Sequence, residues 1–92
     1  MKKGTIVRNL WAGHETYFVY QGAVPTRGVS SRQSWGWRLV RLDDRWKLSR
    51  CNYYTRDLEN DREHFPVVGH VDMDKVMVDA ILSAIGRWND GT

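Results

Sequence analysis

The sequence has one cysteine and two prolines, and it has no apolar run near the ~20 residues that a membrane-spanning helix requires. A lone cysteine, Cys51, cannot form an internal disulfide, which is typical of a reducing compartment and excludes a disulfide-stapled scaffold. After Met1, the basic Lys2 and Lys3 are not followed by the apolar stretch of a secretory signal. We therefore expect a cytoplasmic protein that does not engage a membrane.

Motifs that carry chemistry are also missing. His14, His64 and His70 follow no paired spacing typical of metal ligands. The glycines match neither a phosphate-binding loop nor a dinucleotide fingerprint, and the glutamates form no evident acid–base pair. Cys51 has no base beside it and is expected to be a small buried residue. We predict a protein that is not an enzyme, with no catalytic residue, no bound metal and no cofactor.

The length of 92 residues allows one hydrophobic core, so we predict a single domain over residues 1–92. Hydrophobic residues make up 41% of the chain and charged residues 27%, a composition typical of a globular domain rather than a disordered tail.

Two strands are predicted in the N-terminal third. Residues 5–11 carry β-branched and aromatic side chains between two glycines. Residues 15–21 have apolar side chains at odd and at even positions, such as Tyr17 and Phe18. This doubly apolar pattern is expected where both faces of a sheet are covered or where the sheet curls.

The middle of the chain predicts a loop and a hairpin. Residues 22–34 contain glycine, proline and hydroxyl residues without a sustained period, so we expect a long loop and a candidate contact surface. Residues 35–42 and 45–50 predict a hairpin around an Asp-Asp turn, because the second arm alternates apolar and polar side chains. Gly36, between two tryptophans, indicates a bulge, a bend or a ring lying across the backbone.

The C-terminal part predicts a connection, a short strand and a helix. Residues 55–64 are dense in charge and are expected to be exposed, and residues 65–69 predict a short buried strand that Pro66 confines to an edge or a first position. A helix is predicted over residues 73–88 with Asp72 as its cap. Its apolar face is predicted to hold Met77, Ile81, Ala84, Ile85 and Trp88.

This order of elements predicts an α+β, mainly β fold. We expect a small curled antiparallel sheet or an SH3-like half-open barrel, closed by one C-terminal amphipathic helix. The alternative is an open antiparallel sheet with the helix on one face.

Charge is distributed unevenly along the chain. Residues 1–56 have a net charge of +8 and residues 57–92 have a net charge of −5, which together give the overall +3. One explanation is that the two halves neutralise each other, with the acidic connection lying against the basic sheet. The other is that the basic half binds an acidic partner.

Arginine and tryptophan alternate in the basic half, and five tryptophans exceed what a small core usually needs. Trp46 and Trp88 fall at positions expected in the core, whereas the tryptophans beside the loop are expected to be partly exposed. Arginine and aromatic rings on a sheet are typical of single-stranded nucleic-acid platforms and also of protein-binding hot spots. We therefore predict a binding module for nucleic acid or a nucleic-acid-associated protein, with a site formed by Arg27, Arg32, Trp35, Trp37, Arg38 and Arg41.

The two ends of the chain resemble a group of known sequences. Residues 4–13, 15–20 and 65–69 resemble segments of small uncharacterised proteins of bacterial phages and mobile elements. The resemblance implies no activity of its own. It implies an alternative function, that of an inhibitor that binds and blocks a host defence protein, as anti-CRISPR proteins do. The acidic residues of 57–63 could then act as a local nucleic-acid mimic.

Overall fold

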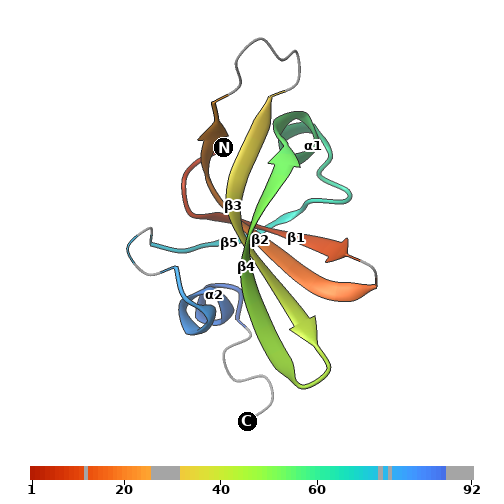
Figure 1. Cartoon of the computed structure of the whole chain (residues 1–92), viewed down its shortest axis with the longest axis vertical. Coiled ribbons are helices and arrows are strands. Elements are labelled where there is room, and N and C mark those ends of the chain that lie inside the picture. Colours follow the sequence, from red (N-terminus) through yellow and green to blue (C-terminus); the bar gives the residue numbers. More distant parts are fainter. Residues whose placement is uncertain (12, 26–31, 73, 75, 87–92) are drawn as a thin grey trace.

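The computed structural model describes residues 1–11, 13–25, 32–72, 74 and 76–86 (Figure 1). Its elements are β1 (Thr5–Trp11), β2 (His14–Val24), β3 (Gln33–Leu42), β4 (Arg45–Tyr54), α1 (Thr55–Asn60), β5 (Val67–His70) and α2 (Val78–Ala84). The strands form one strongly twisted antiparallel sheet in the order β4-β3-β2-β1-β5. The predicted α+β, mainly β class is confirmed, and the sheet is open, with β4 and β5 at its edges, rather than closed into a barrel.

The first two strands meet at a tight turn. β1 has the predicted bounds, and Gly13 in the turn has a φ of 79°, which glycine adopts without strain. β2 runs further than predicted, to Val24, because its last residues pair with the start of β3. Both ends of the predicted 22–34 loop therefore belong to the sheet. Residues 26–31, and with them Arg27, lie outside the described residues.

The predicted hairpin around Asp43 and Asp44 is confirmed. β3 and β4 pair along their whole length, from Leu42↔Arg45 at the turn to the far end of both strands. Asp43 has a φ of 56°, a left-handed conformation that aspartate tolerates better than most residues.

Gly36 lies where a ring crosses the backbone, one of the three arrangements expected there. A Cβ on this residue would lie 2.1 Å from the carbonyl oxygen of Val19 and 2.6 Å from Cζ of Phe18. Only glycine leaves that space to the Phe18 ring. The bulge occurs on the neighbouring strand, between Tyr20 and Gly22 of β2.

Both faces of the sheet carry apolar clusters, as the pattern of β2 predicted. We name each face after the helix that packs on it. On the α2 face the buried cluster consists of Ile6, Tyr17, Val19, Leu39, Val71, Ile81 and Leu82. On the α1 face it consists of Val7, Phe18, Leu58 and Phe65.

Residues 55–64 are exposed at most positions, as their charge predicted, but they are not a plain connection. The segment begins with α1, in which Thr55 and Leu58 are buried. The hydroxyl oxygens of Thr55 and Ser34 form a buried hydrogen bond of 2.7 Å, and Arg62 donates to the carbonyl oxygen of Leu58 at 2.8 Å. Two buried side chains hold the segment on the sheet, and a high local charge density does not reveal them.

The C-terminal helix begins later than predicted. α2 starts at Val78 rather than at residue 73. Asp72 does cap a turn, since its Oδ1 accepts the N–H of Asp74 at 3.0 Å, but this turn is separate from the helix. Met77, expected on the apolar helix face, has an extended backbone and is 61% exposed. Asp72 and Asp74 satisfied the rules for a helix start, but α2 begins only at Val78.

The helix also ends earlier than predicted. Ile85 still donates its N–H to the carbonyl oxygen of Ile81 at 3.1 Å, and Gly86 follows with a φ of 77°. A glycine in the left-handed conformation is a common helix stop. Ile81 is fully buried, so the predicted apolar face is the one that packs, while Trp88 lies outside the described residues.

β5 is an edge strand, as Pro66 predicted. Pro66 precedes the strand, and its carbonyl oxygen accepts the N–H of Arg8 at 2.9 Å. Phe65 is buried, but Val67 is 53% exposed. The strand is therefore half-exposed rather than buried.

Candidate nucleic-acid interface

β3 distributes the predicted binding residues over both faces of the sheet, because side chains alternate along a strand. Trp35, Trp37 and Arg41 lie on the α2 face, in step with the buried Leu39. Arg38 lies on the α1 face, directly across from Phe18. The predicted residues therefore do not form one surface.

The two tryptophans form the centre of an aromatic group with a cation. Their ring centroids are 6.5 Å apart and the ring planes make an angle of 71°, an edge-to-face arrangement. Arg50 of β4 lies opposite Trp37, and its guanidinium carbon is 4.6 Å from the centroid of the Trp35 ring. This distance is within the range of a cation–π contact.

Trp35 also lies across the neighbouring strand. Its Nε1 is 3.5 Å from the position that a Cβ on Gly22 would take. Gly22 and Trp35 are direct partners in the β2–β3 pairing. The small residue on β2 therefore gives the indole room to lie close to the sheet.

α2 covers only one part of its face. Trp37, Trp46 and Leu48 are partly buried and pack against the buried cluster of that face, so Trp46 borders the core rather than lying inside it as expected. Figure 1 shows α2 near one end of the molecule and the start of β3 near the other. The end of the face that carries Trp35 therefore lies away from the helix.

Exposed side chains surround Trp35 at this end. The register places Asn52 opposite Trp35 and Tyr54 opposite Gln33, so both share the α2 face with Arg50. Arg50 and Asn52 are exposed, and Tyr54 is 51% exposed. We call this surface the Trp35 patch, and its members are Trp35, Trp37, Arg50, Asn52 and Tyr54.

Arg41 belongs to a different group near the hairpin turn. Its guanidinium carbon is 5.7 Å from the centroid of the Trp46 ring, which in turn lies 6.1 Å from the Tyr17 ring. Tyr17 donates its hydroxyl to Glu15. Six residues of strand separate Arg41 from Trp35, a distance of about 20 Å. Arg41 is therefore on the predicted face but outside the Trp35 patch.

Arg38 takes part in a polar group on the α1 face. Its Nε is buried, and its charge and side chain act on the hydroxyl of Tyr53. Burial raises the pKa of Tyr53 above its usual value, and the Asn9 hydrogen bond (3.3 Å) and the charge of Arg38 oppose that rise. Arg38 is therefore part of the packing on the α1 face.

Arg32 lies at the start of β3, where its carbonyl oxygen accepts the N–H of Thr55 at 3.1 Å. The residue is exposed, close to the end of the sheet that carries Tyr54. It can add positive charge beside the Trp35 patch.

Sequence reasoning missed three members of the patch, Arg50, Asn52 and Tyr54. The signal was present in the predicted hairpin. In a hairpin with a two-residue turn at Asp43 and Asp44, paired residues lie at equal distances from the turn. Position 37 therefore pairs with position 50, and position 35 pairs with position 52. Cross-strand pairing therefore predicts these neighbours once the turn is accepted.

Two of the acidic residues that follow β4, Glu59 and Asp61, have partners within the chain. Glu59 lies 3.8 Å from the N-terminal amine, and Asp61 lies 2.9 Å from Nδ1 of His64. The hydrogen bond between Asp61 and His64 lowers the pKa of Asp61 and raises the pKa of His64. These carboxylates are thus matched by groups outside the strands of the sheet.

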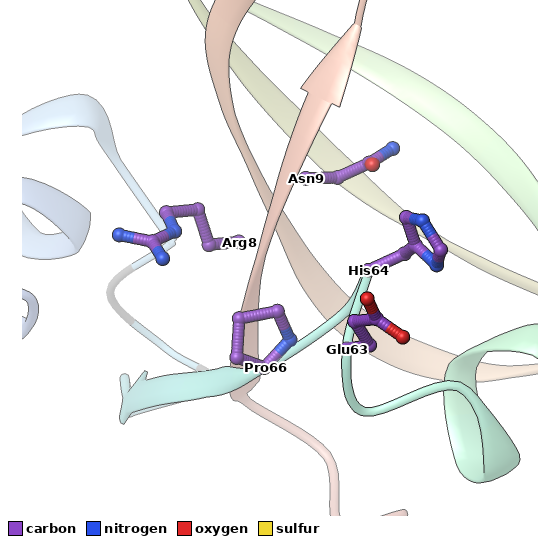
Figure 2. Close-up of a pocket in the computed structure, with 5 residues that line it drawn as sticks. All are labelled: Arg8, Asn9, Glu63, His64 and Pro66. Carbon is purple, nitrogen blue, oxygen red and sulfur yellow. The ribbon is translucent and has the colours of Figure 1, made fainter.

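A half-open pocket of 160 Å³ lies beside β1, lined by Arg8, Asn9, Glu63, His64 and Pro66. Figure 2 shows Arg8 and Asn9 leaving opposite sides of the strand, so the guanidinium points away from His64. Within the described residues, no group of three or more His, Cys, Asp or Glu side chains is placed to hold a metal ion.

Comparison of the chain with protein-family models, curated proteins and solved structures finds no match. In the described part of the chain, no helix is long and apolar enough to cross a membrane. A function for this chain therefore has to be argued from its own residues.

Proposed function

We propose that this chain is a non-enzymatic, cytoplasmic binding module that holds single-stranded nucleic acid on the Trp35 patch. The observation that carries the proposal is the Arg50 guanidinium over Trp35, beside the exposed ring of Tyr54, at an end of the sheet away from α2. Single-strand binders combine cations that follow the backbone with rings on which bases stack.

The rings and cations of this surface have distinct roles in the proposal. Tyr54 offers an exposed ring face to a base, and Trp35 offers a second one when Arg50 turns towards a phosphate. A guanidinium that rests on a ring keeps donors along its edge for a phosphate oxygen. Trp37 supports Trp35 through their edge-to-face contact, and Arg32 adds charge nearby.

A single strand fits this surface better than a duplex. Rings stack only on bases that are already unstacked, whereas sequence readout in a duplex usually needs a helix or ribbon in a groove. The patch is part of a sheet face, and its described residues all belong to strands β3 and β4 of that face.

The test is binding of fluorescently labelled single-stranded and duplex oligonucleotides, measured by anisotropy over a range of salt concentrations. We expect tighter binding of the single strand and an affinity that falls with salt, because phosphate contacts release counterions. Tyr54→Ala should weaken binding about tenfold through the loss of one stacked base. Val67→Ala, which also shortens an exposed apolar side chain but on β5, is the matched control and should bind normally.

A second pair of variants separates the patch from general positive charge. Arg50 and Arg45 are both exposed on β4, but only Arg50 lies on the α2 face. Arg50→Gln should weaken binding several-fold more than Arg45→Gln. Equal losses, or binding that does not respond to salt, would overturn the proposal.

The competing proposal is an inhibitor of a host defence protein. Glu59 and Glu63 are exposed after β4 and would supply its local acidic surface. In this case Glu59→Gln with Glu63→Gln would release a protein partner that survives nuclease treatment, whereas Tyr54→Ala would not.

A further inference from the structure

β4 presents an outer edge that no described strand covers. It is the first strand in the order of the sheet and runs for ten residues, from the hairpin turn at one end to α1 at the other (Figure 1). A strand edge carries backbone N–H and C=O groups that can pair with another extended chain. The edge therefore has the form of a peptide-binding surface.

One hydrogen bond shows which groups of β4 point outward. The N–H of Thr55 donates to the carbonyl oxygen of Arg32 at 3.1 Å, in register with the Leu42↔Arg45 pair that closes the turn. Odd-numbered residues of β4 therefore exchange hydrogen bonds with β3. The backbone groups of the even-numbered residues Trp46, Leu48, Arg50 and Asn52 point away from the sheet.

The side chains along this edge differ between the two faces. Arg45 and Lys47 are exposed on the α1 face. Trp46 and Leu48 are half-buried on the α2 face, followed by the exposed Arg50. No carboxylate occurs between residues 45 and 54. A strand that pairs here would meet cations on one face and mainly apolar side chains on the other.

This pattern disfavours a second copy of the chain as the occupant. Two β4 edges would bring six cations and no carboxylate to one seam. Like charges on neighbouring strands are destabilising, and exposed basic residues are a common protection of edges against self-association. The same cations of β4 would attract a strand that carries carboxylates.

We infer that the outer edge of β4 binds an extended acidic peptide as a sixth strand. In the bound peptide, carboxylates alternate with apolar side chains. The carboxylates lie opposite Arg45 and Lys47 on the α1 face, and the apolar side chains lie beside Trp46 and Leu48 on the α2 face. Backbone hydrogen bonds supply affinity, and the alternation supplies selectivity.

The experiment uses the whole chain and a labelled nine-residue peptide that alternates glutamate and valine. We expect saturable binding by fluorescence anisotropy, and at least tenfold weaker binding when lysine replaces every glutamate. Binding of the lysine peptide with equal affinity, or no binding of the glutamate peptide, would overturn the inference.

N-methylated peptides test the strand pairing itself without altering the protein. One peptide is methylated at its valine nitrogens and the other at its glutamate nitrogens. In a paired strand only one of these sets faces β4, so one methylated peptide should lose about tenfold in affinity and the other should bind normally. Equal behaviour of the two would show attraction by charge without strand pairing.

A protein variant completes the design. Asn52→Pro removes an outward N–H and spares the ladder to β3, so it should weaken peptide binding, while Asn52→Ala should not. Sedimentation of the free chain supplies the last arm: a dimer that Asn52→Pro dissociates would assign the edge to a second copy and contradict the inference.

Discussion

The two faces of the sheet are covered to different extents. On the α1 face, α1 and the residues after it pack on Val7 and Phe18, and Arg38 with its neighbour Tyr53 is part of this packing. On the α2 face, a helix of seven residues covers one part and, among the described elements, does not extend over the end of the face that carries Trp35 (Figure 1). Arginines of neighbouring strands therefore differ: Arg38 is part of the packing on the α1 face, whereas Arg50 is exposed on the α2 face.

The largest effect on stability is expected from Gly36→Ala, which adds a side chain to the packed α1 face. The new Cβ would overlap the Val19 carbonyl oxygen and the Phe18 ring, so we expect a loss of roughly 4 kcal/mol in the free energy of unfolding. Urea denaturation measures it. Gly22→Ala is the matched change on the α2 face, at the end away from the helix, where the nearest atom is a Trp35 nitrogen at 3.5 Å, and it should cost about 1 kcal/mol or less. Similar losses of unfolding free energy for the two variants would contradict the difference in packing between these two positions.

Leu58→Ala tests whether α1 is a structural cover. Leu58 is 1% exposed, so its truncation should lower the free energy of unfolding by about 3 kcal/mol. Arg56→Ala in the same helix removes a side chain that is 83% exposed and should change it by less than about 0.5 kcal/mol. If the two variants were equally stable, residues 55–60 would not be held on the sheet.

Arg38→Met separates the roles of the arginines on β3 and β4. It should lower the free energy of unfolding by about 1 kcal/mol, since methionine keeps the apolar contacts and loses the polar ones. The pKa of Tyr53 should rise further without the nearby positive charge, which an ultraviolet titration of tyrosinate detects. Affinity for a single-stranded oligonucleotide should change less than with Arg50→Gln. The reverse order would place the binding surface on the α1 face.

The smallest effect is expected from pH at the surface pair of His64 and Asp61. The folded pKa of His64 is raised above 6.5, so its stabilising contribution is complete below 6.5 and is lost as pH rises through the folded value. The folded pKa of Asp61 is lowered below 3.8, so its contribution is present above 3.8 and is lost as pH falls through the folded value. The pair therefore stabilises the chain most between these limits.

NMR titration of His64 checks this pair directly. In Asp61→Asn the pKa of His64 should fall towards its usual value. Glu63→Gln leaves the hydrogen bond in place and should lower that pKa less, because Glu63 is a weaker cause of the shift. An unchanged His64 pKa in Asp61→Asn would contradict the contact.

Local rules predicted much of the sheet. The bounds of β1 and the hairpin at Asp43 followed from side-chain period and turn chemistry, and the ring over Gly36 was one of three arrangements left open there. Strict alternation from Trp37 would already have separated Arg38 from the tryptophans. The site prediction grouped residues by closeness in sequence, and adjacent residues of a strand point to opposite faces.

Contacts between distant segments could not be predicted in the same way. The burial of Leu58 depends on meeting Phe18, forty residues earlier in the chain, and the extension of β2 to Val24 depends on pairing with β3. The helix α2 also begins at Val78, although Asp72 has the features of a helix cap. For Leu58 and for the end of β2, a partner outside the segment decided the outcome.

The sequence by itself determined the strand pattern, the turns and the two apolar rows, because these depend on residues a few positions apart. Only the tertiary structure decided how far α2 covers its face and which arginine lies over which indole. The physical reason is that burial and cross-strand contact are set by the whole sheet and its helices, and residues that are neighbours in sequence do not report them.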